Sequence, residues 1–331
     1  MFCIHQRRYT GSKYKLANWI IELINKYCVG SSFLEIFAGT SVIASLIAPK
    51  MKKIILNDTL ESSRVIYKAF YGTGEYDIEK LEAFKLKVND KENTSKGGYF
   101  AKNYGGTYFS LSDCRKIEYI RNLIEKEKNT PREYAILLSS LIYSMDRCAN
   151  TVGHFDAYRR SGSVIDKFAF DLIQPLDLAD VEVEIYNEDA NRLAKKITAD
   201  IVYVDPPYNS RQYCQFYHIY ETIVRWDNSE LFVVALKPKG RLLSDYCRSK
   251  APHVFDDLIK NLNCRYIVVS YNNTYHSKSN SSKNKITLEE IETTLTEKGY
   301  VQQFSTSHQF FNAGKTDFPD HKELLYIVKV K

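Results

Sequence analysis

A short apolar strand that ends at two consecutive prolines constrains the fold most. Residues 201–204 are Ile-Val-Tyr-Val, and Asp205, Pro206, Pro207 and Tyr208 follow directly. β-branched and aromatic residues without polar alternation predict a strand buried on both faces of a parallel sheet. Proline fixes φ and has no N–H, so the strand must end here. Ligands of open α/β sheets bind just beyond the carboxyl ends of strands, so this turn is a candidate binding site.

The turn carries groups that suit recognition of an amino group. Asp205 and the carbonyl of Pro206 can accept two hydrogen bonds from one NH₂, and Tyr208 offers a flat face for stacking on a base. A purely structural turn is the alternative. The order Asp-Pro-Pro-Tyr directly after an apolar strand favours a functional turn.

Length and composition set broad limits. The 331 residues can form one large domain with an insertion, and the net charge of +6 fits a polyanion partner as well as ordinary surface chemistry. The seven cysteines include no CxxC pair, which disfavours structural zinc and is typical of reduced thiols in a cytosol. No apolar run approaches the roughly 20 residues of a membrane span. We therefore expect a soluble intracellular protein.

The first strand–turn–helix unit is typical of a nucleotide-binding sheet. An apolar strand over residues 32–36 enters the turn Phe37-Ala38-Gly39, and a helix continues to about Ile47. The turn contains a single glycine, Gly39, which still allows close approach of the backbone to a ligand. Ser41 is expected to help cap the helix. Upstream, Lys13 follows a turn at Gly11 and precedes a helix, which makes it a candidate site for a carboxylate or simply a solvated lysine.

Acidic residues follow two further strands. The strand over residues 54–56 leads to Asp58, about 20 residues after the first turn, where an acid reaches a ribose hydroxyl. Asp58 as a helix cap is the alternative. A strand over residues 183–186 leads to Glu188 and Asp189, which can accept from the amino group of an adenine or cap the next helix.

The stretch from Asp58 to the strand at 183–186 is far longer than a strand crossover requires. It contains three expected helices, at 78–87, 113–126 and 131–146, the last with a capping box of Thr130 and Glu133. Its loops at 96–109 and 147–160 combine glycines, aromatic wedges and positive charge, which suits groove and phosphate contacts. Ordinary loops that pack their own aromatic residues are the alternative.

The remainder predicts the far side of the sheet. A helix is expected at 216–226 and a buried strand at 265–272, followed by a mobile loop at 273–284 that closes over DNA. A helix begins with a capping box of Thr287 and Glu290 and stops at Gly299. Strands at 301–304 and 324–331 are expected to form an antiparallel pair.

Four signals occur in one order: Tyr-Thr-Gly-Ser-Lys at 9–13, the turn at 37–39, Asp58, and Asp-Pro-Pro-Tyr at 205–208. With the insertion before the last, this order resembles the Dam-type (alpha-group) adenine-N6 DNA methyltransferases over nearly the whole chain. In detail, residues 205–213 and Asn-Thr-Val-Gly-His-Phe-Asp-Ala-Tyr at 150–158 resemble the FokI- and NlaIII-type restriction-modification methylases. Thr40 departs from the pattern, because relatives often carry Gly or Ser there.

The resemblance implies an α/β fold with a Rossmann-like, mixed seven-stranded sheet of the S-adenosylmethionine-dependent methyltransferases and an inserted, mainly helical subdomain. Residues 1–71 and 181–331 would form the catalytic domain that binds S-adenosyl-L-methionine, and residues 72–180 the target-recognition subdomain. The implied partner is double-stranded DNA, and a cognate restriction endonuclease is a further candidate. We expect a monomer without a membrane partner, in the cytoplasm of a prokaryotic cell and associated with the nucleoid.

The implied site residues fall into three groups, and no metal is expected. The catalytic group is Asp205, Pro206, Pro207 and Tyr208. The cofactor group is Tyr9, Lys13, Glu35, Phe37, Ala38, Gly39, Asp58, Glu188, Asp189 and Asp205. The DNA-contacting group is Lys96, Lys102, Arg147, His154, Tyr158, Arg159, Arg160, Arg211, Gln212 and Tyr213.

Three other classes stay open from the sequence. An RNA or protein amide N-methyltransferase uses a similar tetrad, usually with Asn first. A cytosine-N4 methyltransferase typically has Ser there. A non-catalytic DNA-binding module needs neither the tetrad nor the cofactor turn. The Asp form and the long insertion favour adenine in duplex DNA, with the adenine flipped out of the helix.

Overall fold

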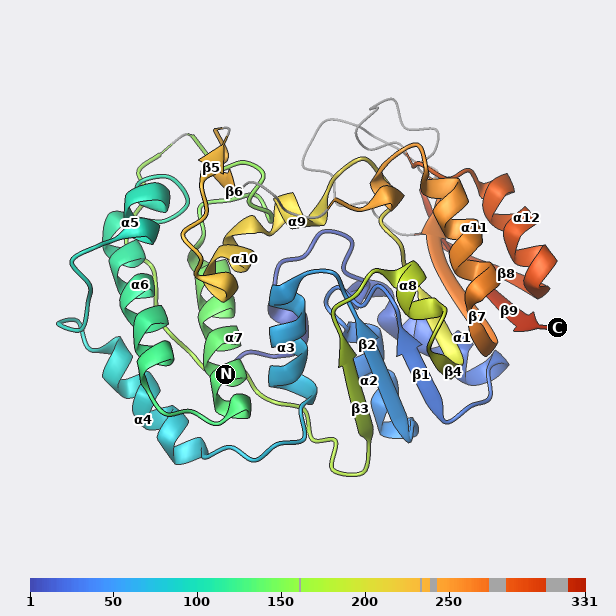
Figure 1. The fold of residues 1–331 in the computed structure, drawn as a ribbon, viewed down its shortest axis with the longest axis horizontal. Helices are drawn as coiled ribbons and strands as arrows, with labels where there is room; N and C mark the ends of the chain where they lie inside the picture. The colour runs from blue at the N-terminus through green and yellow to red at the C-terminus, as the bar shows by residue number, and fades with distance from the viewer. Residues whose placement is uncertain (161, 233, 239–242, 274–283, 308–320) are drawn as a thin grey trace. The chain divides into compact units, whose positions relative to one another are not determined.

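The chain forms two compact units in the computed structural model (Figure 1), which describes residues 1–160, 162–232, 234–238, 243–273, 284–307 and 321–331. Unit 1 comprises Met1–Ser12, Leu60–Ala179 and Cys214–Arg241. Unit 2 comprises Lys13–Thr59, Asp180–Tyr213 and Leu242–Lys331. The insertion expected at 72–180 lies in unit 1 except for its last residue, and unit 1 also contains three segments from outside that range.

Unit 2 is built on a seven-stranded sheet with the strand order β3-β2-β1-β4-β7-β9-β8. The strands are β1 (Ser32–Glu35), β2 (Lys53–Asn57), β3 (Glu182–Tyr186), β4 (Thr198–Val204), β7 (Asn263–Asn272), β8 (Gly299–Ser307) and β9 (Lys322–Val330). The first five in the spatial order are parallel, and β9 is antiparallel to both of its neighbours. The predicted mixed seven-stranded α/β fold is confirmed.

The register brings three strand ends to one edge of this sheet. Glu35 at the end of β1 pairs with Leu56 of β2 and with Tyr203 of β4. The residues that follow these strands, including Asp58 and Asp205, therefore emerge at the same edge, because parallel strands present their carboxyl ends together.

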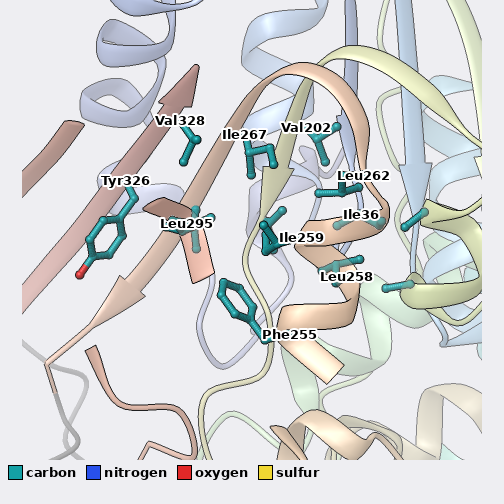
Figure 2. Close-up of a cluster of buried hydrophobic side chains, with 14 of the residues drawn as sticks. Ile36, Val202, Phe255, Leu258, Ile259, Leu262, Ile267, Leu295, Tyr326 and Val328 are labelled. Carbon is teal, nitrogen blue, oxygen red and sulfur yellow. The ribbon is translucent and has the colours of Figure 1, made fainter. Parts of the chain in front are cut away.

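Helices cover both faces of the sheet in unit 2. Figure 1 shows α8 (Ala190–Ala194), α11 (Ala251–Asn261) and α12 (Leu288–Lys298) in front of the strands, with α1 (Ala17–Tyr27) and α2 (Val42–Ile47) behind them. In Figure 2, Phe255, Leu258 and Ile259 of α11 lie over Val202 and Ile267 of the sheet. Helix α11 was not predicted from the sequence.

The C-terminal elements agree with the prediction, but the reason for a glycine at position 299 differs from the expected one. The capping box of Thr287 and Glu290 and the antiparallel pair of β8 and β9 are confirmed. Gly299 stands at the C-cap of α12, but its φ of −179° is extended and not left-handed. A Cβ at this position would lie 2.2 Å from the Lys329 carbonyl oxygen, so the close approach of β9 is what requires glycine.

Unit 1 is mainly helical. Its elements are α3 (Glu61–Tyr71), α4 (Ile78–Asn89), α5 (Tyr99–Tyr104), α6 (Leu111–Lys126), α7 (Pro131–Cys148), α9 (Tyr213–Phe216, with its first residue in unit 2), α10 (His218–Arg225) and the short strands β5 (Leu231–Phe232) and β6 (Lys237–Pro238). Helix α7 packs against α3 and α6 and is buried along almost its whole length. The three helices expected in the insertion and the capping box of α7 are confirmed.

The helix expected at 216–226 is present as α10, and Phe216 belongs to the separate short helix α9. One expectation for unit 1 is wrong. The segment at 96–109 was expected to be a loop, but it contains α5, and Phe100, Tyr104, Tyr108 and Phe109 are all buried. Packing of these aromatic rings forms part of the core of unit 1, so they are not exposed wedges. Within the described ranges, no helix has both the length and the apolar content of a bilayer span.

Candidate functional site

The turn after β4 holds a buried ion pair. The Nζ of Lys13 lies 3.0 Å from Oδ2 of Asp205, with the two side chains 6% and 17% exposed. Lys13 also donates a hydrogen bond to the Tyr208 hydroxyl, which itself donates to Oδ1 of Asp205. Both oxygens of the Asp205 carboxylate therefore accept from groups that are fixed by the fold. Lys13 was a candidate to bind the carboxylate of a ligand. In the structure, the carboxylate beside it is that of Asp205.

Burial governs the protonation of this cluster. It raises the pKa of Asp205, although Lys13 and the Tyr208 hydroxyl both oppose this rise. It raises the pKa of Tyr208 well above the ordinary value, and the Asp205 charge adds to the effect. Tyr208 thus stays a phenol at neutral pH and can act as the hydrogen-bond donor.

The Pro206 carbonyl is the second acceptor of this turn. Among the described residues, no N–H or O–H donates to it. The Tyr208 carbonyl, by contrast, accepts a hydrogen bond from the Lys285 N–H at 2.8 Å. The Tyr208 ring packs edge-on against Tyr271, with ring centroids 4.9 Å apart. The turn is therefore held at Tyr208.

The first strand–turn–helix unit is held by Asp58. The Gly39 N–H donates to Oδ2 of Asp58 at 3.0 Å, and the Ala38 N–H donates to the Asn57 carbonyl at 2.9 Å. Gly39 has a φ of +50°, a left-handed conformation that glycine adopts without strain. Asp58 is not a helix cap, because Leu60 occupies the N-cap of α3.

Glu35 and Ser41 make hydrogen bonds around the turn at 37–39 that differ from the predicted ones. Glu35 is buried and accepts from the Ala44 N–H of α2 at 2.9 Å, and burial raises the pKa of Glu35 well above its usual value. Ser41 stands at the N-cap of α2 with φ +54°, but its hydroxyl donates to the Thr40 carbonyl. The prediction that the Ser41 side chain caps α2 is therefore wrong. Phe37 lies edge-on to Tyr246, with ring centroids 5.0 Å apart.

The two acids after β3 make protein contacts. Asp189 caps α8 by accepting from the Arg192 N–H at 3.1 Å. Glu188 forms an ion pair with Lys196 at 2.6 Å. The capping alternative thus applies to Asp189.

Sequence reasoning missed Glu323, a buried residue near the start of β9. It pairs in register with Asn272 of β7, and both Lys13 and Asp205 act on its charge. Burial raises the pKa of Glu323 to about 7, with Asp205 adding to the rise and Lys13 opposing it. An acid directly before the apolar run 324–328 was a signal, but the strand was expected to begin at Leu324.

Tyr9 belongs to unit 1. Its ring stacks on Tyr217 with centroids 4.6 Å apart, and the Arg7 guanidinium lies 4.9 Å from the Tyr9 ring centroid. The neighbouring Thr10 N–H donates to the Tyr217 hydroxyl at 2.6 Å. These contacts fix the chain just before Lys13, the first residue of unit 2.

The two glycine-bearing loops of unit 1 are clamped together by Asn150. Its N–H donates to the Tyr108 carbonyl, and its side-chain amide donates to the carbonyls of Thr107 and Arg159 at 2.8 and 3.0 Å. The predicted basic residues of these loops are all exposed, namely Lys96, Lys102, Arg147, Arg159 and Arg160. Arg159 and Arg160 directly follow the clamped segment, whereas Lys102 lies in α5 and Arg147 in α7.

Other predicted DNA-contacting residues make internal contacts. His154 stacks on Phe216 at 4.4 Å, and Tyr158 lies edge-on to Tyr108. Gln212 exchanges two hydrogen bonds with the backbone of Ser244, at 2.8 and 3.1 Å, and so braces its loop. Arg211 and Tyr213 are half-buried beside it. The expected closing loop at 273–284 lies outside the described residues, except for Asn273 and Asn284.

Residues 9–282 match the family model described as D12 class N6 adenine-specific DNA methyltransferase. The chain belongs to this family. The resemblance inferred from the tetrad at 205–208 is confirmed.

Three relatives show how far the similarity extends. The type II methyltransferase M.NlaIII of Neisseria lactamica is 30% identical, over 95% of both chains. The modification methylases LlaI of Lactococcus lactis and StsI of Streptococcus sanguinis are 32% and 35% identical over 80% of this chain. The chain spans only 46% and 44% of those two relatives, which is less than half of their length.

The ion pair can be tested without any assay of activity. Lys13→Met leaves the buried Asp205 carboxylate without its cation and should lower the free energy of unfolding by about 3 kcal/mol. Adding Asp205→Asn to Lys13→Met should recover part of this loss, since the stranded charge is removed. Urea unfolding of the two single variants and the double variant at pH 7 measures the coupling. Additive losses would mean that the two side chains do not interact.

Proposed function

We propose that this chain transfers a methyl group from S-adenosyl-L-methionine to N6 of an adenine that is flipped out of duplex DNA. The observation that carries the proposal is the pair of acceptors after β4, the Asp205 carboxylate and the Pro206 carbonyl, beside the Tyr208 ring. These groups match one NH₂ group on a planar base. Membership of the N6 adenine-specific family supports the same substrate.

The chemical task is to make the adenine amino group nucleophilic. Its lone pair is delocalised into the ring, so the neutral amino group is a weak nucleophile. Hydrogen bonds from the NH₂ to Asp205 and to the Pro206 carbonyl favour a more tetrahedral nitrogen, whose lone pair can then point at the methyl group in line. An amino group that bonds to Asp205 takes the place of one of its present donors, Lys13 or Tyr208.

Unit 2 offers a donor set that fits the cofactor. Asp58 is a partly exposed carboxylate suited to a ribose diol, and Phe37 supplies an aromatic face for an adenine ring. Lys13 suits a carboxylate, and Asp205 carries the opposite charge to a sulfonium. S-adenosyl-L-methionine supplies an activated methyl group when it is bound. Glu35, Ala38 and Gly39 would shape the turn around it, and Tyr9, Glu188 and Asp189 remain proposed contacts.

Target recognition is proposed for the basic loops of unit 1. The Asn150 clamp joins Thr107 and Tyr108 to Arg159, and the side chains of Arg159 and Arg160 are exposed. Phosphate contacts position a protein on DNA, whereas base contacts specify sequence. The type II modification methylases among the relatives suggest that this chain protects a site from a cognate endonuclease. We expect it to act as a monomer.

The first test concerns the reaction. Asp205→Ala should lower the rate of methyl transfer on the order of 10²-fold or more, because it removes one preorganised acceptor. Transfer of tritiated methyl groups to DNA, RNA and protein, followed by nucleoside analysis, identifies the product. N6-methyladenine in DNA is expected from the wild type. N4-methylcytosine, or labelled RNA or protein, would assign the chain to one of the other classes.

The second test concerns the cofactor site. Asp58→Asn keeps an acceptor for the Gly39 N–H but loses the charge. It should weaken S-adenosyl-L-methionine binding by about 1.5–3 kcal/mol, measured by isothermal titration. Asp256→Asn, on the exposed side of α11, is the matched control. Unchanged affinity in Asp58→Asn would restrict Asp58 to bracing the turn.

The third test concerns the basic loops. Alanine at Arg159 and Arg160 together should weaken binding to all duplex sequences, and the slope of log affinity against log salt should fall by about 1 per lost phosphate contact. Fluorescence anisotropy at several salt concentrations measures both quantities. Alanine at Lys329 and Lys331 together, two exposed lysines of unit 2, controls for the loss of two positive charges. An equal effect in that control would place DNA binding elsewhere.

A further inference from the structure

Tyr246 is buried in unit 2 between two elements that carry proposed contacts to the adenine ring of the cofactor. It lies in the short 3-10 helix η4 (Asp245–Cys247), and its side chain is 4% exposed. Its ring packs edge-on against Phe37, with centroids 5.0 Å apart and an interplanar angle of 77°. Its hydroxyl donates to Oδ1 of Asn191 at 2.8 Å. One side chain thus joins the turn after β1 to helix α8.

Asn191 fastens the first turn of α8 to α11. It lies two residues after Asp189, which caps α8. Its side-chain amide donates to the Val254 carbonyl at 2.7 Å and to Oδ2 of Asp257 at 2.8 Å, and both acceptors belong to α11. The Tyr246 hydroxyl lies 3.2 Å from the same Val254 carbonyl. The start of α8, with Asp189, is therefore fixed against Tyr246 and α11.

The backbone around Tyr246 is fixed as well. The Tyr246 N–H donates to the Ser244 hydroxyl at 3.3 Å, which caps η4. The Ser244 backbone exchanges its two hydrogen bonds with the Gln212 side chain, and the Cys247 thiol donates to the Arg211 carbonyl at 3.2 Å. A shift of Tyr246 would break these contacts, so its ring is a rigid support.

Phe37 is the residue that this ring supports. It lies in the turn at 37–39, and its side chain is only partly buried. A ring that packs edge-on covers at most one face of its neighbour, so Tyr246 leaves the other face of Phe37 uncovered. Without Tyr246, the Phe37 ring would have more conformational freedom, and a ligand that stacks on it would have to order the ring on binding.

We propose that Tyr246 is a positioning residue for the cofactor. Its ring holds Phe37 in the orientation that stacks on the adenine ring, and its hydroxyl holds α8 so that Asp189 can accept from the adenine amino group. The inference rests on the proposed cofactor contacts of Phe37 and Asp189. Because Tyr246 acts through these two residues, its effect should appear in the affinity for ligands that contain adenine.

Two substitutions separate the ring of Tyr246 from its hydroxyl. Tyr246→Leu should weaken binding of S-adenosylhomocysteine, the demethylated cofactor, about tenfold, whereas Tyr246→Phe keeps the ring and should weaken it about threefold. Isothermal titration measures both affinities without turnover. Tyr300→Leu, at a tyrosine of β8 that is 70% exposed, is the matched control and should bind as the wild type does. Wild-type affinity in either Tyr246 variant would overturn the proposal.

A double-mutant cycle shows whether Tyr246 acts through Phe37. Phe37→Leu alone should weaken binding of S-adenosylhomocysteine about tenfold or more, because a stacking face is lost. Adding Tyr246→Leu should then weaken binding only about threefold further, since the contact between the two rings is already gone. Additive losses, which a merely structural role would produce, would overturn the proposal. Unchanged affinity in Phe37→Leu would overturn the proposed cofactor site instead.

A second ligand tests the part played by the hydroxyl. S-inosylhomocysteine carries an oxygen in place of the adenine amino group, so it offers no N–H₂ to Asp189. Tyr246→Phe should bind it as the wild type does, and the preference for S-adenosylhomocysteine should therefore narrow about threefold. Equal weakening of both ligands would overturn the proposal, because a loss of structure does not distinguish between them.

Discussion

The ion pair between Lys13 and Asp205 is the interaction on which the rest of the site depends. Taking two charges out of water costs several kcal/mol per ion, and the pair repays this only with good geometry and further hydrogen bonds. Tyr208 supplies the further bond, since its hydroxyl lies between the ammonium and the carboxylate. An apolar pair would pack here at lower cost, so the charges indicate a requirement beyond stability.

Three other acids, which end or follow strands of this sheet, each accept a hydrogen bond from a backbone N–H. Asp58 accepts from Gly39, Glu35 accepts from Ala44, and Asp189 accepts from Arg192. Each bond ties a strand end to the turn or helix beside it. Three acids at the carboxyl edge of the sheet are therefore held by main-chain donors, whereas Asp205 is held by the side chains of Lys13 and Tyr208. Both kinds of support provide the rigidity that an electrostatic site requires.

The sequence predicted those parts of the fold that depend on local patterns. Apolar runs located β1, β2, β4 and β7, and capping boxes located the starts of α7 and α12. The misses share a cause, which is contact between residues distant in the chain. The glycines around 96–109 suggested a loop, but burial of Phe100 and Tyr104 against other helices stabilises α5. Gly299 was predicted to end helix α12. The reason that glycine is needed there is its close contact with Lys329, which exists only once β8 and β9 have paired.

The site shows the same division. The tetrad at 205–208 is contiguous and could be recognised from the sequence, whereas Glu323 joins it through the register of β7 with β9, which no local pattern gives. The charges of Lys13 and Asp205 act on Glu35 as well as on Glu323. Acids that are far apart in the chain therefore come within electrostatic range of one buried cation, and the pairing of the strands, not a local pattern, brings them there.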